Sequence, residues 1–169
     1  LELREDIDGV VAGKLLLNLN NGICAATGLS ILESLESHEG RECFSRCIVE
    51  GIDVMRAAGV EPKSVIALPP GMIAKVLRGP DFLVVPGLKA MAGVDPDARS
   101  STLQDLDRKR PTEIQELNGA IVELARERMP APCNGAVVEA VREHEACVSR
   151  GEAPKFLTAR ELLDRMDAG

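Results

Sequence analysis

The sequence predicts an all-α fold, and three observations lead to that prediction. Apolar residues recur at steps of three and four over long stretches, which is the period of an amphipathic helix. No stretch shows the convincing alternation of apolar and polar residues that is typical of a half-buried strand. Capping and stop signals stand at the ends of the periodic stretches. Because no internal repeat is present, we expect one multi-helix domain.

A chain of 169 residues can bury one substantial core, so we predict a single helical domain over residues 1–169. In this prediction residues 6–149 are its firm part, and residues 150–169 are a polar tail with room for a short helix. The sequence begins at Leu1 and has neither the basic start nor the apolar stretch of a signal peptide. We interpret the chain as a piece of a longer protein.

The charge balance excludes some classes of partner. Lysine and arginine number 20 against 27 aspartates and glutamates, which gives a net charge of −7. This balance does not suit a surface that follows a phosphate backbone, and an aromatic content of 2% leaves few side chains on which bases could stack. No apolar run approaches the roughly 20 residues that cross a bilayer. We expect no nucleic-acid partner, no membrane span and a cytoplasmic location.

The cysteines indicate a reduced setting. They form an odd set of five without a C-x-x-C spacing, and four of them lie in helical patterns. Cys43 and Cys47 are one helical turn apart and could share a metal, but His38 and His144 show no ligand spacing around them. We expect small hydrophobic residues that pack in the core, and no metal site.

The first predicted helix covers about residues 7–35, where apolar residues fall on nearly every face, as in a helix surrounded by others. Gly22 and Gly28 weaken its interior, so we expect a kink or a break near them. The second predicted helix covers about residues 41–58. Gly59 follows it as a left-handed stop.

Residues 62–96 are punctuated by proline and glycine, which leaves room only for short helices at about residues 73–77 and 83–92. Thr112 followed by Gln115 has the pattern of a capping box and predicts that a helix begins there.

Two further helices are predicted toward the C-terminus. Asn134 follows Pro130-Ala131-Pro132 and is the expected cap of a helix with valines on one side. Residues 158–166 form a short terminal helix in this prediction.

One face of the first predicted helix carries polar side chains. At about 100° per residue, Lys14, Asn18 and Asn21 fall within about 60° of one another. Buried polar groups without partners cost about 1 to 3 kcal/mol each, so these side chains need partners or solvent. One interpretation is that Lys14 reaches solvent and the asparagines bond loop backbone. The other is that all three belong to a site.

A second polar cluster lies far along the chain. Ser101 lies in a turn after Ser100, Asp105 is an acid that can cap that turn, and Glu113 stands where a helix dipole would favour negative charge. Each also has an ordinary explanation: Ser100-Ser101 as the N-cap of a short helix, Asp105 as a solvated acid and Glu113 as a first-turn charge. A lysine, amides, a hydroxyl and a carboxylate together can hold a 2-keto acid and protonate its carbonyl oxygen. We therefore expect both clusters to border one cleft.

The sequence resembles the C-terminal domain of the ketopantoate reductase (2-dehydropantoate 2-reductase) family over about residues 6–145. The resemblance is carried by K-L-L-L-N-L-N-N, then R-S-S-T-L-Q-D-L-D-R-K-R-P-T-E-I-Q-E-L-N-G, then A-P-C-N. It implies an all-helical domain related to the C-terminal half of 6-phosphogluconate dehydrogenase. In the intact protein, that domain would close on an N-terminal Rossmann domain, with substrate and NADPH between them.

The resemblance also implies an activity, namely hydride transfer from NADPH to C2 of 2-dehydropantoate, which yields pantoate for pantothenate biosynthesis. Lys14 matches the catalytic lysine that donates a proton to the developing alkoxide. Asn18 and Asn21 match substrate-binding amides, and Ser101 matches a substrate-binding serine. Glu113 matches a glutamate at the junction of substrate and cofactor.

The chain departs from the family pattern in several places. Ala12 stands where many members have tryptophan, and Thr102 where methionine is more usual. Asn21 follows the lysine by seven residues, whereas some members have eight. No two glycines are separated by a single residue, so the core of a dinucleotide-binding fingerprint is missing. We expect the isolated chain to be inactive, and hydride transfer to require roughly 150 further residues.

Two alternatives stay open. The first is a reductase of another branched 2-keto acid on the same scaffold. The second is a noncatalytic helical module used for dimerisation. Gly9 and Gly13 have the four-residue spacing that lets helices approach closely, which fits a homodimer interface and also ordinary packing.

Overall fold

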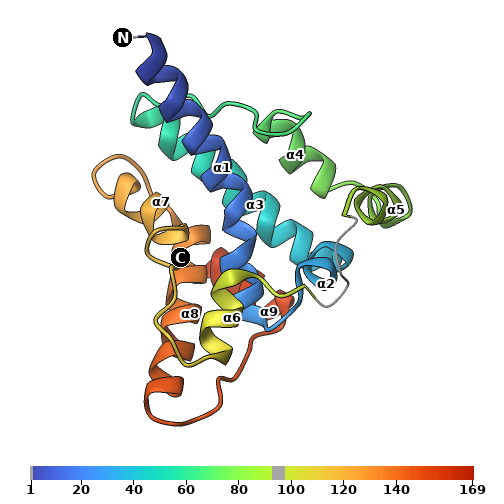
Figure 1. Cartoon of the computed structure of the whole chain (residues 1–169), viewed down its shortest axis with the longest axis vertical. Coiled ribbons are helices and arrows are strands. Elements are labelled where there is room, and N and C mark those ends of the chain that lie inside the picture. Colours follow the sequence, from blue (N-terminus) through green and yellow to red (C-terminus); the bar gives the residue numbers. More distant parts are fainter. Residues whose placement is uncertain (1, 93–97) are drawn as a thin grey trace.

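The computed structural model describes residues 2–92 and 98–169, with side chains for residues 8–88 and 98–169. Within these ranges the chain forms nine helices and no strand (Figure 1), which confirms the predicted all-α fold. The helices are α1 (Glu2–Thr27), α2 (Ile31–Glu36), α3 (His38–Ala57), α4 (Pro70–Leu77), α5 (Asp81–Ala92), α6 (Ser101–Asp107), α7 (Asn118–Ala125), α8 (Pro132–Ser149) and α9 (Ala159–Ala168).

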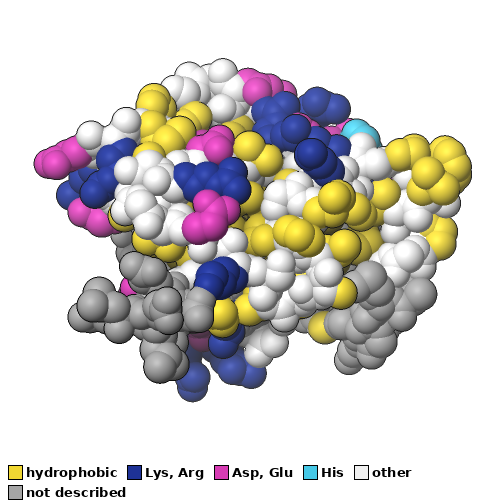
Figure 2. All heavy atoms as spheres, turned by 90° about the horizontal axis from the view of Figure 1, so that it is seen from above, with side chains coloured by type: hydrophobic (Ala, Val, Ile, Leu, Met, Phe, Trp, Pro, Cys, Tyr) yellow, Lys and Arg dark blue, Asp and Glu magenta, His cyan; other side chains and the backbone are white. Residues whose placement is uncertain are grey.

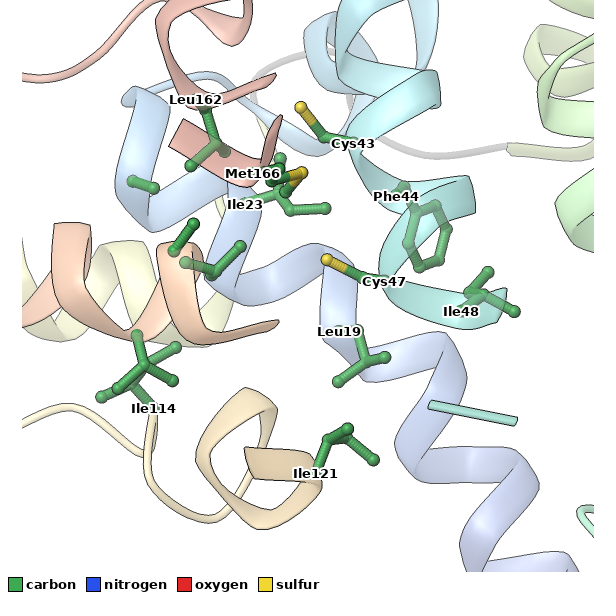
Figure 3. Close-up of a cluster of buried hydrophobic side chains, with 14 of the residues drawn as sticks. Leu19, Ile23, Cys43, Phe44, Cys47, Ile48, Ile114, Ile121, Leu162 and Met166 are labelled. Atoms are coloured by element: carbon green, nitrogen blue, oxygen red, sulfur yellow. The ribbon is translucent and has the colours of Figure 1, made fainter. Parts of the chain in front are cut away.

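The long helix α1 passes through the middle of the domain (Figure 1) and packs against α3, α6 and α8. Its side chains Leu16, Leu19 and Ile23 are completely buried. Figure 3 shows Leu19 and Ile23 among apolar side chains from several other helices. The partners labelled there are Cys43, Phe44, Cys47, Ile48, Ile114, Ile121, Leu162 and Met166. Apolar residues on nearly every face of α1 are thus explained by neighbours on several sides.

The first helical pattern breaks where glycine permits it. α1 ends at Thr27, and Gly28 has a φ of +73°, which confirms the predicted break. The helix is continuous through Gly22, however. A Cβ there would lie 2.2 Å from Oδ1 of Asn118 and 2.8 Å from Cγ1 of Val137. Gly22 therefore allows the close approach of α7 and α8 and does not break the helix.

Several other predicted elements are present. α3 lies within three residues of its prediction, and Gly59 after it has a φ of +80°. The two short helices predicted before residue 93 correspond to α4 and α5. α9 begins with a capping box between Thr158 and Glu161, and it packs on α3 and α8. Its residues Leu162, Leu163 and Met166 are buried, so the segment predicted as a polar tail contributes to the core.

The prediction that a helix begins at Thr112 is wrong. Residues 113–117 form turns, and α7 begins at Asn118. The backbone N and Oγ1 of Thr112 both donate hydrogen bonds to Oε1 of Glu145 on α8, at 2.8 and 2.7 Å. Thr112 is therefore held by a distant helix and does not form a capping box with Gln115.

The prediction that Asn134 caps a helix is also wrong. α8 begins at Pro132, so Asn134 lies within its first turn and is buried. The carboxylate of Glu50, on α3, accepts hydrogen bonds from the backbone N of Cys133 and of Asn134, each at 2.8 Å. Nδ2 of Asn134 also donates to Glu50 and to the carbonyl of Cys47. A side chain from another helix thus caps α8, where the helix dipole favours a negative charge.

A buried cation fixes the start of α5. Arg41 is fully buried, and its Nε donates to the carbonyl of Leu77 at the end of α4. Its Nη2 forms an ion pair with Asp81, the first residue of α5. α5 leaves apolar side chains uncovered, and Figure 2 shows hydrophobic groups on this side of the molecule, at the right of the view. Phe82 and Leu83 are 76% and 64% exposed.

No helix in the described part of the chain has the length and apolar character needed to span a membrane. The His, Cys, Asp and Glu side chains that the structure describes form no group of three or more that could hold a metal ion. All five cysteines are free thiols. Cys43 and Cys47 are completely buried, and burial raises the pKa of the Cys43 thiol to about 12.

Candidate active site

Two segments that are 80 residues apart meet beside the C-terminal half of α1. Nδ2 of Asn21 donates a hydrogen bond to Oγ of Ser101 at 3.4 Å. Oγ of Ser101 in turn donates to Oε1 of Glu113 at 2.5 Å, the length expected when a hydroxyl donates to a carboxylate. Three of the predicted site residues are therefore joined in one hydrogen-bond chain, which we call the Asn21–Ser101–Glu113 chain.

Ser100 places Ser101 beside α1. Oγ of Ser100 accepts a hydrogen bond from the backbone N of Leu103 and so caps α6. The same oxygen donates to the carbonyl of Asn21 at 3.1 Å, and Ser100 is only 2% exposed. Sequence reasoning identified Ser100 as a cap but missed its bond to α1, because spacing along the chain carries no signal for a contact over 79 residues.

Glu113 lies in the turns between α6 and α7, so the prediction that it stands in the first turn of a helix is wrong. Thr112 before it is tied to Glu145, and Ile114 after it is buried. These two anchors hold the exposed Glu113 carboxylate next to Ser101. Its interaction is with a hydroxyl group and not with a helix dipole.

Lys14 and Asn18 lie on the same face of α1 as Asn21. With a rise of 1.5 Å per residue, Asn18 is about 4.5 Å and Lys14 about 10 Å from Asn21 along the helix axis. Lys14 is exposed and Asn18 is half-buried. In the part of the chain that the structure describes, neither side chain forms a hydrogen bond or an ion pair. The structure therefore brings Asn21, Ser101 and Glu113 together, and it leaves the Lys14 ammonium in solvent without contact to them.

The backbone just before Lys14 is nevertheless firmly packed. A Cβ at Gly13 would lie 1.9 Å from the carbonyl oxygen of Lys63, and one at Gly9 would lie 2.8 Å from that of Glu61. The backbone N of Lys63 also donates to the carbonyl of Gly9 at 2.8 Å. The small residues at these two positions therefore make room for a loop of the same chain.

Asp105, the other acid of the second predicted cluster, is half-buried in α6. Its carbonyl accepts a hydrogen bond from the backbone N of Arg110 at 2.9 Å. Its carboxylate makes no hydrogen bond or ion pair with the residues that the structure describes. Asp105 is therefore not part of the Asn21–Ser101–Glu113 chain.

A solved structure with a similar fold is the ternary structure of D-mandelate dehydrogenase with NADH and anilino(oxo)acetate. The TM-score is 0.62 and the sequence identity is 15%. The match covers 82% of this chain and 41% of that chain, so this chain spans less than half the length of the dehydrogenase. At this identity the similarity establishes the fold alone.

A comparison with curated proteins finds no match. The family model described as ketopantoate reductase PanE/ApbA C terminal matches residues 6–145. This range is most of the chain and includes Lys14, Asn18, Asn21, Ser101 and Glu113. The chain therefore belongs to the ketopantoate reductase C-terminal family.

Proposed function

We propose that this chain is the catalytic and substrate-binding half of an NADPH-dependent 2-dehydropantoate 2-reductase. The observation that carries the proposal is the Asn21–Ser101–Glu113 chain, which lies on the face of α1 that also presents Lys14, a lysine without a partner among the described residues. Family membership supports it. So does the similar fold of a dehydrogenase bound to NADH and a compound with an oxo group next to a carboxylate.

In this proposal each residue has the role that the family resemblance implies, and its hydrogen-bonding capacity suits that role. The exposed ammonium of Lys14 donates a proton to the C2 oxygen of the substrate as that oxygen becomes an alkoxide. Asn18 lies between Lys14 and Asn21, and no described residue bonds its amide, which is left for the substrate. Asn21 uses one N–H on Ser101 and keeps the other.

Glu113 sets the direction of the Ser101 hydroxyl. Because that hydroxyl donates to Glu113 and accepts from Asn21, one lone pair of Oγ is left to accept another hydrogen bond. The 4-hydroxyl group of ketopantoate is a suitable donor for it. A 2-keto acid without this hydroxyl would lose that hydrogen bond, so the arrangement favours ketopantoate over a plain branched 2-keto acid.

The cofactor NADPH supplies the hydride that reduces C2. The exposed carboxylate of Glu113 is the group in this chain that suits a contact with the cofactor. The phosphates require a glycine-rich turn at the start of a helix, and no two glycines of this chain are separated by a single residue. The proposal therefore assigns most of the cofactor contacts to an N-terminal Rossmann domain.

The test is Lys14→Ala in a protein that joins this chain to its nucleotide-binding domain. We expect kcat for 2-dehydropantoate to fall by about 10²- to 10⁴-fold, since a positioned proton donor is lost. The melting temperature should not change, because the side chain is exposed. Lys75→Ala, at another exposed lysine, is the matched control and should keep full activity. A kcat like that of the wild type in Lys14→Ala would remove Lys14 from the mechanism.

The same protein separates the substrate alternatives. We expect the ratio kcat/KM to be highest for 2-dehydropantoate in a panel of branched 2-keto acids. Ser101→Ala should reduce the preference for the substrate that carries the 4-hydroxyl group. If an acid without that group has a higher kcat/KM, that acid and not ketopantoate is the substrate.

A further inference from the structure

A hollow of about 690 Å³ lies between the end of α6 and the C-terminal half of α8. It has the size of small-molecule sites, which occupy about 300 to 1,000 Å³. Lys109, Arg110 and Pro111 line one side, and Arg142 and Glu145 line the other. None of the five residues of the candidate active site lines it.

The charges around this hollow are not balanced within the chain. In the described residues, the side chains of Lys109, Arg110 and Arg142 form no ion pair. The acid on the wall, Glu145, accepts two hydrogen bonds from Thr112 at its Oε1 and sets one negative charge against the three positive ones. Three free cations therefore border one concavity in a chain whose net charge is −7.

Other arginines near the hollow have acidic partners. Arg99 pairs with Asp107 at 2.9 Å, and Arg150 pairs with Glu152 at 3.0 Å. Acids are thus available in this region, and the three cations of the hollow are left out of such pairs.

The backbone gives a second, independent observation. Lys109 has a φ of +54°, a backbone conformation that residues other than glycine rarely adopt. Its backbone N donates to the carbonyl of Leu106 at 3.0 Å, at the end of α6, where glycine is the usual residue. A strained position that holds a lysine instead of glycine is typical of sites where the side chain has a use.

We propose that this hollow binds the phosphate group of a small phosphorylated molecule. Arginine binds phosphate through two parallel hydrogen bonds, and lysine binds it as a compact charge. Three cations suit a dianionic phosphate better than a carboxylate, which carries a single charge. Leu106 and Val148 in the same wall can pack against the organic part. The site is independent of the proposed reductase activity because it uses different residues.

The experiment titrates the 169-residue chain with phenyl phosphate, inorganic phosphate and acetate at constant ionic strength. Binding is followed by amide chemical shifts in NMR spectra. We expect saturable binding of both phosphates, with the largest shifts at residues 109–111 and 142–149. Phenyl phosphate should bind more tightly than inorganic phosphate because it also buries apolar surface.

The double variant Arg110→Gln/Arg142→Gln should bind phenyl phosphate at least about tenfold more weakly, because two charge-assisted contacts are lost. Arg126→Gln/Arg128→Gln removes the same charge from exposed positions outside the hollow and should bind like the wild type. An equal loss in both double variants would show attraction to net charge only and would overturn the proposal. Acetate binding as tightly as the phosphates would also overturn it, and so would shifts centred elsewhere.

Discussion

The two halves of α1 have different surroundings. In the C-terminal half, Leu19 and Ile23 are completely buried, and Asn21 is hydrogen-bonded to α6. In the N-terminal half, Val10 and Val11 are 44% and 61% exposed, and Lys14 has no partner among the described residues. The hydrogen-bonding part of the candidate site thus lies beside the buried half of the helix, with Ser101 and Glu113 exposed at the surface. The group assigned as proton donor stands on an uncovered surface of the same helix.

Exposure of the N-terminal half does not mean that its backbone is free. Gly13, next to Lys14, packs against the carbonyl of Lys63. The helix therefore holds the backbone of Lys14 in a fixed position relative to Asn21. The exposed lysine side chain can still change between rotamers. Such a side chain can be ordered by a ligand, and the proposed proton transfer needs that ordering.

The largest expected effect on stability is the loss of a core side chain from the C-terminal half of α1, compared with the loss of an exposed one from the N-terminal half. Ile23→Ala should lower the free energy of unfolding by about 2 to 5 kcal/mol, because it leaves a cavity in the core. Val11→Ala should change it by no more than about 0.5 kcal/mol, because the side chain is exposed. Urea unfolding followed by circular dichroism measures both. Equal costs would mean that the N-terminal half is packed as tightly as the C-terminal half.

A smaller effect is expected at the joint between α1 and α6. Ser100→Ala removes the cap of α6 and the bond to the carbonyl of Asn21, and should cost about 1 to 2 kcal/mol. Hydrogen exchange at the amide of Leu103 should become faster. Ser101→Ala is the matched control, and its cost should be lower because Ser101 is exposed. A larger cost for Ser101→Ala would place the anchor of α6 at the site hydroxyl instead.

The comparison also separates what the sequence could predict from what it could not. Helical periodicity identified α1 and α3 because burial repeats along a single element. The stripe of Lys14, Asn18 and Asn21 follows from the same geometry. Its connection to Ser101 and Glu113 was predicted from the complementary chemistry of the two clusters and from the family resemblance, since no local pattern reports a contact over 80 residues.

The wrong helix starts have a common cause. Thr112 and Asn134 have the local pattern of caps. Glu145 and Glu50, however, reach them from other helices and accept hydrogen bonds from their backbone N–H groups. Gly22 shows the same limit, because its small size serves Asn118 and Val137 from distant elements. Local capping rules were correct where no remote side chain competed, as at Thr158 in α9.

The smallest expected effect concerns the capping box at the start of α2, three residues after the end of α1. The backbone N of Ser30 donates a hydrogen bond to the Glu33 carboxylate at 2.7 Å. This bond and, to a smaller extent, the Ser30 hydroxyl lower the pKa of Glu33 from its ordinary value of 4.5. Because this pKa is lower in the folded state, ionised Glu33 stabilises the fold above pH 4.5, and the contribution is lost as pH falls through the lowered pKa.

Glu33→Gln should therefore be slightly less stable than the wild type at neutral pH, with the difference closing in acid. Urea unfolding over a pH series measures it, and Glu127→Gln, at an exposed glutamate on no such turn, should show no comparable change. A difference that persists in acid would mean that Glu33 acts through packing. In that case the start of α2 would not depend on the charge of Glu33.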